Sequence, residues 1–322
     1  MSLHMLLLGL AGRVPDDGLA VMRTSLADGD LDDLAELLVA AARTGKLALS
    51  TQEKALIRAT AAEAGVHTTG LDTPGPDTTG PDPAGPGTAG PDRPTRHRFA
   101  PDEAATLDAD QAAVGAADRV GGLTALWRVL RTTGGGGVRV WLGEAEPDAD
   151  VVELVAELQH SLAEAGQDPP RVEVFARGEA LPAYHNYALG QARLVWARNP
   201  EPRLARVFDG VDAAGGPVFA PDRPRARGQR RQLLLDYLWA GELVLTTPGL
   251  MVDVFDGSPT VPLSFRSDGI WVWTDAVAYY LDRHHVAPAP ELTEHILSAA
   301  GPPAALGRAG RHQALVVLEG TT

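Results

Sequence analysis

Two tryptophans and two tyrosines fall within ten residues, at 271–280, and are the side chains best suited to hold another molecule. On a strand Trp271 and Trp273 would share one face, with aliphatic residues on the other. Burial in the core is the more common use of such a cluster, and we favour it. The alternative is an exposed binding surface, formed by Arg266, Asp268, Trp271, Trp273 and Tyr279.

This stretch also carries an ordered series of short motifs. An Asp-Gly turn at Asp268, a Trp-x-Trp strand and a Tyr-Tyr helix follow one another. The series is similar to a recurrent C-terminal pattern of uncharacterised actinobacterial proteins, and the resemblance covers residues 242–300. The arginine-rich, lysine-poor usage also resembles that of a high-GC genome. The resemblance implies no activity, ligand or catalytic residue.

A second candidate site is a local positive patch in an otherwise acidic domain. It consists of Arg223, Arg225, Arg227, Arg230 and Arg231. Guanidinium groups suit bidentate contacts with phosphate, with a carboxylate-rich partner or with RNA. We favour a solvated loop whose arginines balance the protein's own carboxylates, because aromatic side chains that would stack on bases are missing nearby.

A third candidate is acidic and follows a predicted strand, at the end where open α/β sheets tend to bind ligands. Asp148 and Asp150 have the spacing of a metal-bridged nucleotide-sugar site. We favour a capping role, in which one of them begins the next helix and the acids complement its dipole. No metal site is therefore expected, and Asp148 with Asp150 is the alternative.

Several chemistries are excluded by residue type. The chain has no cysteine, and Lys46 and Lys54 are its only lysines, so a thiol nucleophile and a lysine in the large domain are ruled out. The nine histidines lack the spacing of a zinc protease, and adjacent His284 and His285 point to different sides of a helix. A Gly-x-Ser-x-Gly elbow is also missing. We expect no cofactor and lean against an enzyme.

The elements that must position these residues begin with a helical module at residues 1–67. Apolar residues recur there at helical spacing, and Ser50 with Glu53 matches a capping box, so a helix should start at this point. Asp30 should cap the preceding helix.

Residues 68–98 are a predicted flexible linker. Gly-Pro pairs recur there with a five-residue period, which is wrong for collagen and typical of an extended, mobile tether. The segment 85–90 fits the dinucleotide pattern GxGxxG, but we dismiss it because a strand does not precede it and a helix does not follow.

Residues 99–322 form the predicted large domain. A strand at 138–142, a helix at 151–165 and a strand at 171–175 make a βαβ unit with two parallel strands. The other expected helices lie at 102–130, with an interruption near Gly121 and Gly122, and at 181–197, 229–240, 275–284 and 290–299. An antiparallel meander of strands is expected at 242–247, 250–255, 260–265 and 269–273, and a last strand at 313–318. The predicted fold class is α+β.

Composition and net charge exclude several classes of protein. Apolar residues make up 44% and charged residues 22%, which is globular. The net charge of −14 argues against a surface that grips nucleic acid or an anionic membrane. The early apolar run lacks the basic residues and cleavage region of a leader, and the apolar runs are too short to span a bilayer, so we expect a cytoplasmic protein.

We therefore predict a non-enzymatic, cytoplasmic protein-interaction or regulatory protein with a protein partner. A flexible tether suits a chain in which one module recruits and the other acts. The alternative is a small-ligand sensor or an enzyme acting on a nucleotide- or sugar-like ligand. RNA binding through the arginine patch is the least favoured hypothesis, and no membrane partner is expected.

Overall fold

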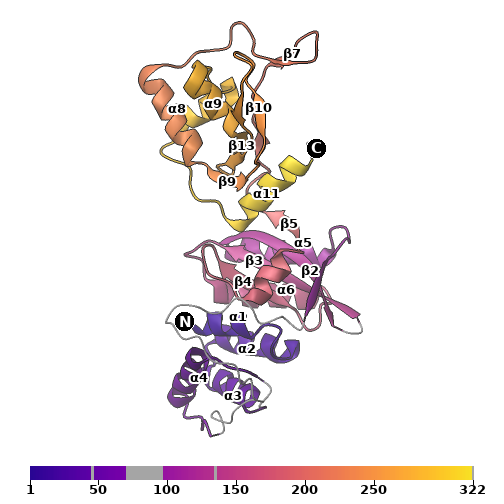
Figure 1. The fold of residues 1–322 in the computed structure, drawn as a ribbon. Helices are drawn as coiled ribbons and strands as arrows, with labels where there is room; N and C mark the ends of the chain where they lie inside the picture. Colours follow the sequence, from indigo (N-terminus) through magenta and orange to yellow (C-terminus); the bar gives the residue numbers. More distant parts are fainter. Residues whose placement is uncertain (45–46, 70–96, 134–135, 321–322) are drawn as a thin grey trace. The chain divides into compact units, whose positions relative to one another are not determined.

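The computed structural model describes residues 1–44, 47–69, 97–133 and 136–320. Within them the chain forms eleven helices and thirteen strands, which confirms the α+β class (Figure 1). The chain divides into two compact units, Met1–Arg198 and Asn199–Thr322, which are described separately. Most of the predicted Gly/Pro linker, including the GxGxxG match at 85–90, lies outside the described residues.

Four helices begin the first unit. They are α1 (Leu3–Leu10), α2 (Asp16–Asp28), α3 (Leu31–Arg43) and α4 (Thr51–Glu63). The capping box is confirmed, since the Glu53 amide donates to Ser50 Oγ at 3.2 Å and the Ser50 amide donates to Glu53 at 2.7 Å. The Asp30 side chain caps α3 as predicted. Apolar side chains of all four helices meet in one core.

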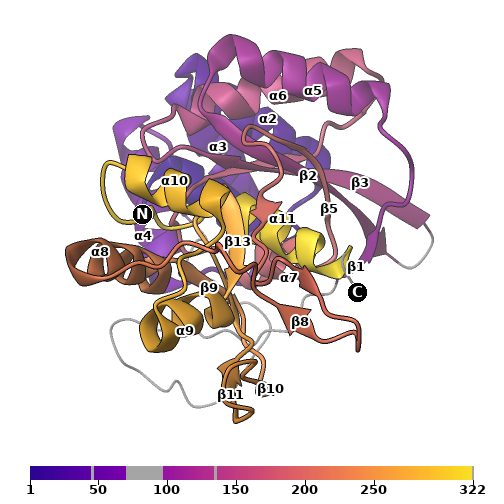
Figure 2. The ribbon, with the colours of Figure 1, turned by 90° about the horizontal axis from the view of Figure 1, so that it is seen from above.

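A five-stranded sheet forms the rest of this unit. Its strands are β1 (Arg98–Pro101), β2 (Leu123–Thr133), β3 (Gly136–Ala145), β4 (Val172–Ala176) and β5 (Arg193–Ala197), and its helices are α5 (Asp108–Val120), α6 (Val151–Glu164) and α7 (Ala183–Leu189). The strand order is β1-β2-β3-β4, with β5 also paired to β2. Strands β3 and β4 are parallel and joined through α6, so the βαβ unit is confirmed. Helices α5 and α6 lie side by side and pack on the sheet (Figure 2).

The N-terminal helices are joined to strand β4 through buried polar side chains. Arg23 of α2 and Glu173 of β4 form an ion pair in which both side chains are only 5% exposed. Nε2 of His4 in α1 donates to the carbonyl of Val174 at 2.9 Å. Polar groups this deep are favourable only when they are paired. The helices therefore depend on the sheet for their partners.

One aspartate extends this connection to two further arginines. Asp16, at the start of α2, accepts hydrogen bonds from Arg131 of β2 and from Arg171, the latter at 2.6 Å. Residues 1–67 and the sheet thus belong to one unit, whereas the sequence suggested a separate helical module and a single domain at 99–322. These partners lie far apart along the chain, and local patterns do not connect them.

The predicted helix at 102–130 is wrong in its second half. Helix α5 ends at Val120, Gly121 and Gly122 follow with φ of 83° and 85°, and β2 begins at Leu123. Every side chain from Leu123 to Val129 is buried, because the strand is covered on both faces. A run buried on both faces loses the alternation that marks a strand. The predicted helix at 181–197 likewise becomes α7 followed by β5.

The second unit combines short strands with four helices. The strands are β6 (Arg203–Leu204), β7 (Gly210–Val211), β8 (Pro217–Val218), β9 (Glu242–Leu245), β10 (Leu250–Val252), β11 (Pro259–Pro262), β12 (Phe265–Ser267) and β13 (Trp271–Thr274), and the helices are α8 (Gly228–Ala240), α9 (Asp275–His284), α10 (Pro290–Ser298) and α11 (Arg308–Glu319). Its main sheet has the order β6-β13-β12-β9, while β10 and β11 form a separate hairpin. The four strands of the predicted meander correspond to β9, β10, β11 and β13, but they do not form one sheet. β10 and β11 pair with each other, and β12, which was not predicted, lies between β9 and β13.

The predicted strand at 313–318 is also wrong, because this segment lies in helix α11. Ala314 and Leu318, four residues apart, are buried against Val244 and Val272, while Val316 is exposed. That spacing follows one helix face. Short apolar runs do not distinguish strand from helix, and here tertiary packing decided.

Candidate functional site

The two tryptophans are core residues. Trp271 is 8% exposed and Trp273 is 0% exposed, and both pack among apolar side chains of α8, α9 and α10. The Trp273 indole donates to the Leu238 carbonyl at 3.2 Å, which satisfies its buried N–H. A Cβ at Gly241 would lie 2.3 Å from the Trp273 ring, so only glycine fits there. Both tryptophans therefore lie in the core, as the favoured interpretation expected. Because Trp273 is fully buried, the alternative binding surface cannot include it.

The other three residues of the predicted surface do not lie together. Arg266 bonds Asp275 at 2.9 Å and lies over the ring of Trp239 at 5.1 Å. The Asp268 carboxylate is nearly buried, and its Oδ2 accepts from Tyr237 at 2.9 Å and from His295 at 2.6 Å. Burial and this bond to Asp268 raise the pKa of Tyr237. The Asp268 carboxylate is therefore bound by side chains of the protein itself, Tyr237 and His295.

Most arginines of the predicted patch bind carboxylates or carbonyls of the protein itself. Arg223 is buried and paired with Asp209, and Arg231 is paired with Asp282. Arg225 donates to the carbonyl of His284 at 2.6 Å. Among the described residues, Arg227 and Arg230 are exposed and form no ion pair, so a five-arginine anion site is not present. The favoured charge-balance interpretation fits Arg223 and Arg231.

The acidic segment after β3 borders an open hollow of about 380 Å³ with Gly121, Gly122, Glu146 and Glu153. Asp150 Oδ1 accepts from the amides of Val152 and Glu153, both at 3.0 Å, and thus caps α6. The ionisable side chains that line this hollow are all carboxylates, and no histidine is among them. The capping interpretation accounts for Asp150, and an acidic cluster alone does not make a metal site.

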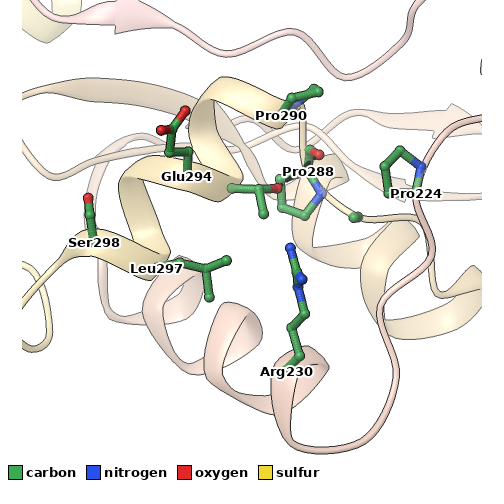
Figure 3. Close-up of a pocket in the computed structure, with 9 residues that line it drawn as sticks. Pro224, Arg230, Pro288, Pro290, Glu294, Leu297 and Ser298 are labelled. Carbon is green, nitrogen blue, oxygen red and sulfur yellow. Dashed lines mark hydrogen bonds between the residues drawn. The ribbon is translucent and has the colours of Figure 1, made fainter.

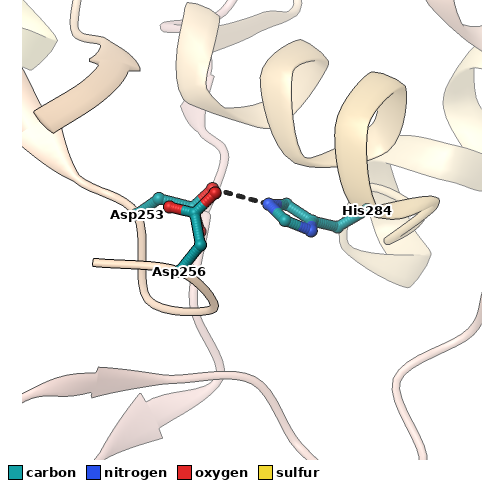
Figure 4. A group of neighbouring side chains, drawn as sticks. All are labelled: Asp253, Asp256 and His284. Atoms are coloured by element: carbon teal, nitrogen blue, oxygen red, sulfur yellow. Dashed lines mark hydrogen bonds and ion pairs between the residues drawn. The ribbon is translucent and has the colours of Figure 1, made fainter. Parts of the chain in front are cut away.

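A cluster that sequence reasoning missed lies between the β10–β11 turn and the end of α9. Asp253, Asp256 and His284, here called the Asp253 centre, each bring a ligand atom within 4.8 Å of the others (Figure 4). Asp253 is only 1% exposed, and its Oδ2 accepts from His284 Nε2 at 2.6 Å and from Tyr279 at 2.8 Å. Tyr279, assigned above to the aromatic surface, thus belongs to this centre.

Local structure explains how the two aspartates converge. The amide of Asp253 donates to the Ser258 carbonyl at 2.8 Å, and Gly257 has a φ of 74°, which closes the turn that contains Asp256. His284 is the last residue of α9, and His285 follows in the left-handed conformation. The Asp256-Gly257 turn was visible in the sequence, but its proximity to His284 was not.

Both carboxyl groups of the centre favour the ionised form. Burial alone would raise the pKa of Asp253, but hydrogen bonds from the Phe255 amide, His284 and Tyr279 outweigh it and hold the pKa below its usual range. Bonds from the Ser258 side chain and amide, together with Arg283, lower the pKa of Asp256 to about 2. The centre therefore concentrates negative charge, which the side chains of Arg283 and His284 face.

Aromatic rings enclose the histidine. The Phe255 ring lies 4.5 Å from the His284 ring and the Tyr280 ring lies 5.9 Å from it, measured between centroids. A carboxylate bonded to one imidazole nitrogen fixes the orientation of the ring, a device found in catalytic sites and in metal sites.

An open groove of about 460 Å³ lies between the start of α8 and α10. Three prolines line it, and the Arg230 side chain extends into it opposite Glu294 and Leu297 (Figure 3). Arg230 is the one member of the predicted anion patch that faces this hollow.

The described residues contain no helix long and apolar enough to cross a membrane. Comparison of the chain with protein-family models, curated proteins and solved structures returned no match.

Proposed function

We propose that this is a cytoplasmic protein-interaction or regulatory protein that binds a partner protein through its second unit. The observation that carries the proposal is where apolar side chains reach solvent. Of seventeen exposed large hydrophobic residues among those described, only Met1, Val21, Leu31 and Tyr187 belong to the first unit. The remaining thirteen belong to the smaller second unit, and a binding face forms where such residues lie together.

Three of these residues, from β9 and the end of α8, are grouped with Arg266 and here called the β9 surface. Leu243 and Leu245 alternate along β9, an edge strand, while Val244 between them is buried against α11. Leu243 is paired with Arg266 in the ladder, and Arg266 lies over Trp239, which is 45% exposed. The surface thus comprises Trp239, Leu243, Leu245 and Arg266.

The composition and rigidity of the β9 surface support this role. Tryptophan and arginine are enriched among the residues that dominate binding energy at interfaces. The Arg266 guanidinium is held by Asp275 and by the carbonyls of Trp239 and Gly241 at 3.2 and 3.0 Å. A side chain ordered before binding loses less entropy when a partner arrives.

A site-specific photo-cross-linker placed at Leu243 in the cells that make the protein tests this proposal. We expect one discrete adduct of fixed stoichiometry from position 243, and we expect Leu245→Glu to abolish it by placing a charge in the contact. The same cross-linker at exposed Glu201 of this unit is the control. Equal adduct patterns from both positions, together with turnover of a metabolite by the purified protein, would rule the proposal out.

A second candidate function rests on the groove of α8 and α10. Its volume of about 460 Å³ is within the range of small-ligand sites, and Arg230 supplies one cation for an anionic group. This supports the alternative of a sensor or enzyme for a nucleotide- or sugar-like ligand. A nucleotide at a hundred times its Kd should add about 2.7 kcal/mol to the stability of the folded chain. Thermal-shift measurements of wild type and Arg230→Gln check this.

A further inference from the structure

The Asp253 centre arranges donors from two separate elements around one point. Asp253 and Asp256 come from the turn between β10 and β11, and His284 comes from the end of α9. Their ligand atoms all lie within 4.8 Å of one another. Figure 4 shows both carboxylates directed toward the imidazole.

Each carboxylate has one oxygen held by its own turn. Asp253 Oδ1 accepts from the Phe255 amide at 2.9 Å, and Asp256 Oδ1 accepts from the Ser258 amide at 2.9 Å and from the Ser258 hydroxyl. The Oδ2 atoms face other elements, with His284 and Tyr279 on Asp253 and Arg283 on Asp256. The turn thus orients two carboxylates before any cation binds, as outer hydrogen bonds do in metal sites.

We propose that the Asp253 centre binds a divalent transition-metal ion of the zinc class. Asp253, Asp256 and His284 Nε2 would be its ligands. This inference is independent of the β9 surface and adds a site to a chain for which no metal was expected.

The donor set selects the ion class. An imidazole with carboxylates suits Zn²⁺ and its neighbours, whereas Ca²⁺ and Mg²⁺ prefer oxygen donors alone. Three protein ligands leave a fourth position for water or for an atom of a bound molecule. Tyr279, which donates to Asp253 at 2.8 Å, would hold that carboxylate from the outer shell.

Binding replaces the present contacts of the two carboxylates with His284 and Arg283 by bonds to the metal. Metal–ligand bonds of about 2.0–2.2 Å place tetrahedral donor atoms about 3.4 Å apart. The three ligand atoms now lie within 4.8 Å of one another, so they must approach by up to about 1.4 Å, a movement that the exposed Asp256 turn can make. His284 would bind as the neutral imidazole with its one proton on Nδ1, so the proton that now lies on Nε2 leaves to solvent and the Nε2 lone pair faces the metal. The guanidinium of Arg283, more than half exposed, moves off Asp256.

Arg283 therefore competes with the metal, and this gives the inference a distinctive test. Its guanidinium lies 2.8 Å from Asp256 and 3.9 Å from Asp253. Arg283→Gln should bind the metal more tightly than the wild type. Arg206→Gln, which removes the same charge from an exposed arginine paired with Glu291, is the matched control and should leave the affinity unchanged.

The experiment is a titration of the full chain with ZnCl₂ by calorimetry, and with Co²⁺ followed by its visible absorption. We expect one ion per chain and at least about a tenfold loss of affinity in Asp256→Asn and in His284→Gln. His160→Gln is the control for adventitious binding, because His160 and Glu164 form an exposed pair one helical turn apart. It should bind as the wild type does.

Asp256→Asn decides the outcome if His284→Gln is poorly folded, because Asp256 is exposed and its Oδ1 bonds do not need the charge. Circular dichroism without metal verifies that each variant is folded. Absence of saturable binding, or equal affinity in wild type and Asp256→Asn, would overturn the inference. Loss of binding in His160→Gln alone would also overturn it, by locating the ion on α6.

Discussion

At the scale of single residues, chemical type alone did not reveal role. Trp271 and Trp273 attract attention as indoles, yet they pack inside, while Trp239 with a less conspicuous context is exposed. Five arginines close in sequence have different environments: Arg223 forms a buried ion pair, whereas Arg230 faces a groove. Role depends on which neighbours the fold supplies, and those neighbours lie far away along the chain.

Two tryptophans of the second unit should respond oppositely to truncation. Trp273→Ala removes a fully buried indole and should lower the free energy of unfolding by about 3–5 kcal/mol. Trp239→Ala removes an exposed ring whose contact with Arg266 is worth about 1 kcal/mol or less. Urea unfolding of the full chain measures both. Equal losses would mean that Trp273 is not the core residue described here.

At the scale of elements, the sequence predicted what local physics controls. The Ser50 capping box, the βαβ unit and helices α8, α9 and α10 were all predictable from caps and periodicity. Strand β2 and helix α11 were not, because apolar runs buried by tertiary contacts carry no clear period. The Asp253 centre could not be predicted from the sequence for a related reason. Its ligand atoms come together only when the β10–β11 hairpin packs beside α9.

The buried ion pair between Arg23 of α2 and Glu173 of β4 should control how stably these elements are joined. Glu173→Gln leaves Arg23 buried without its counter-charge and should destabilise the fold by about 3–5 kcal/mol. Replacing both with leucine should cost less than the single change, because no unpaired charge remains. Urea unfolding with both variants checks this. A double variant less stable than Glu173→Gln would contradict it.

His4 makes the attachment of α1 sensitive to mild acid. Burial lowers the pKa of His4, so the folded chain holds this proton less tightly than the unfolded chain. The stability should be full above the ordinary pKa of about 6.5 and should fall as the pH drops from there toward the lowered folded value.

His4→Gln keeps a donor for the Val174 carbonyl without titrating, so it should flatten this pH dependence. Hydrogen exchange of the α1 and α2 amides, measured on both sides of the ordinary pKa, gives the readout. The burial-lowered pKa of His312 in α11 makes His312→Gln the control, which should leave exchange in α1 and α2 unchanged. Identical exchange profiles for wild type and His4→Gln would refute the assignment.

At the scale of the whole molecule, the two units have separate interiors. Among the described residues, two apolar clusters of the first unit draw on residues up to Trp196, and three of the second draw on residues from Ala205 onward. The sequence suggested a different division, at the Gly/Pro segment, because composition changes most sharply there. Composition marks where a chain is unlikely to pack, whereas unit boundaries follow which surfaces are buried together.

Fragments divided at the two alternative boundaries should therefore behave differently. Residues 199–322 expressed alone should show helical circular dichroism and one cooperative unfolding transition, since their cores are complete. Residues 99–322 lack the helices that cover Glu173 and Tyr184. In this fragment Glu173 and the Val172 carbonyl would lose the hydrogen bonds that Arg23 donates to them, and apolar surface around Tyr184 would be exposed. This fragment should bind a hydrophobic dye and lose the cooperative transition of the sheet. If it instead unfolds as the full chain does while 199–322 remains unfolded, the boundary at Arg198 is wrong.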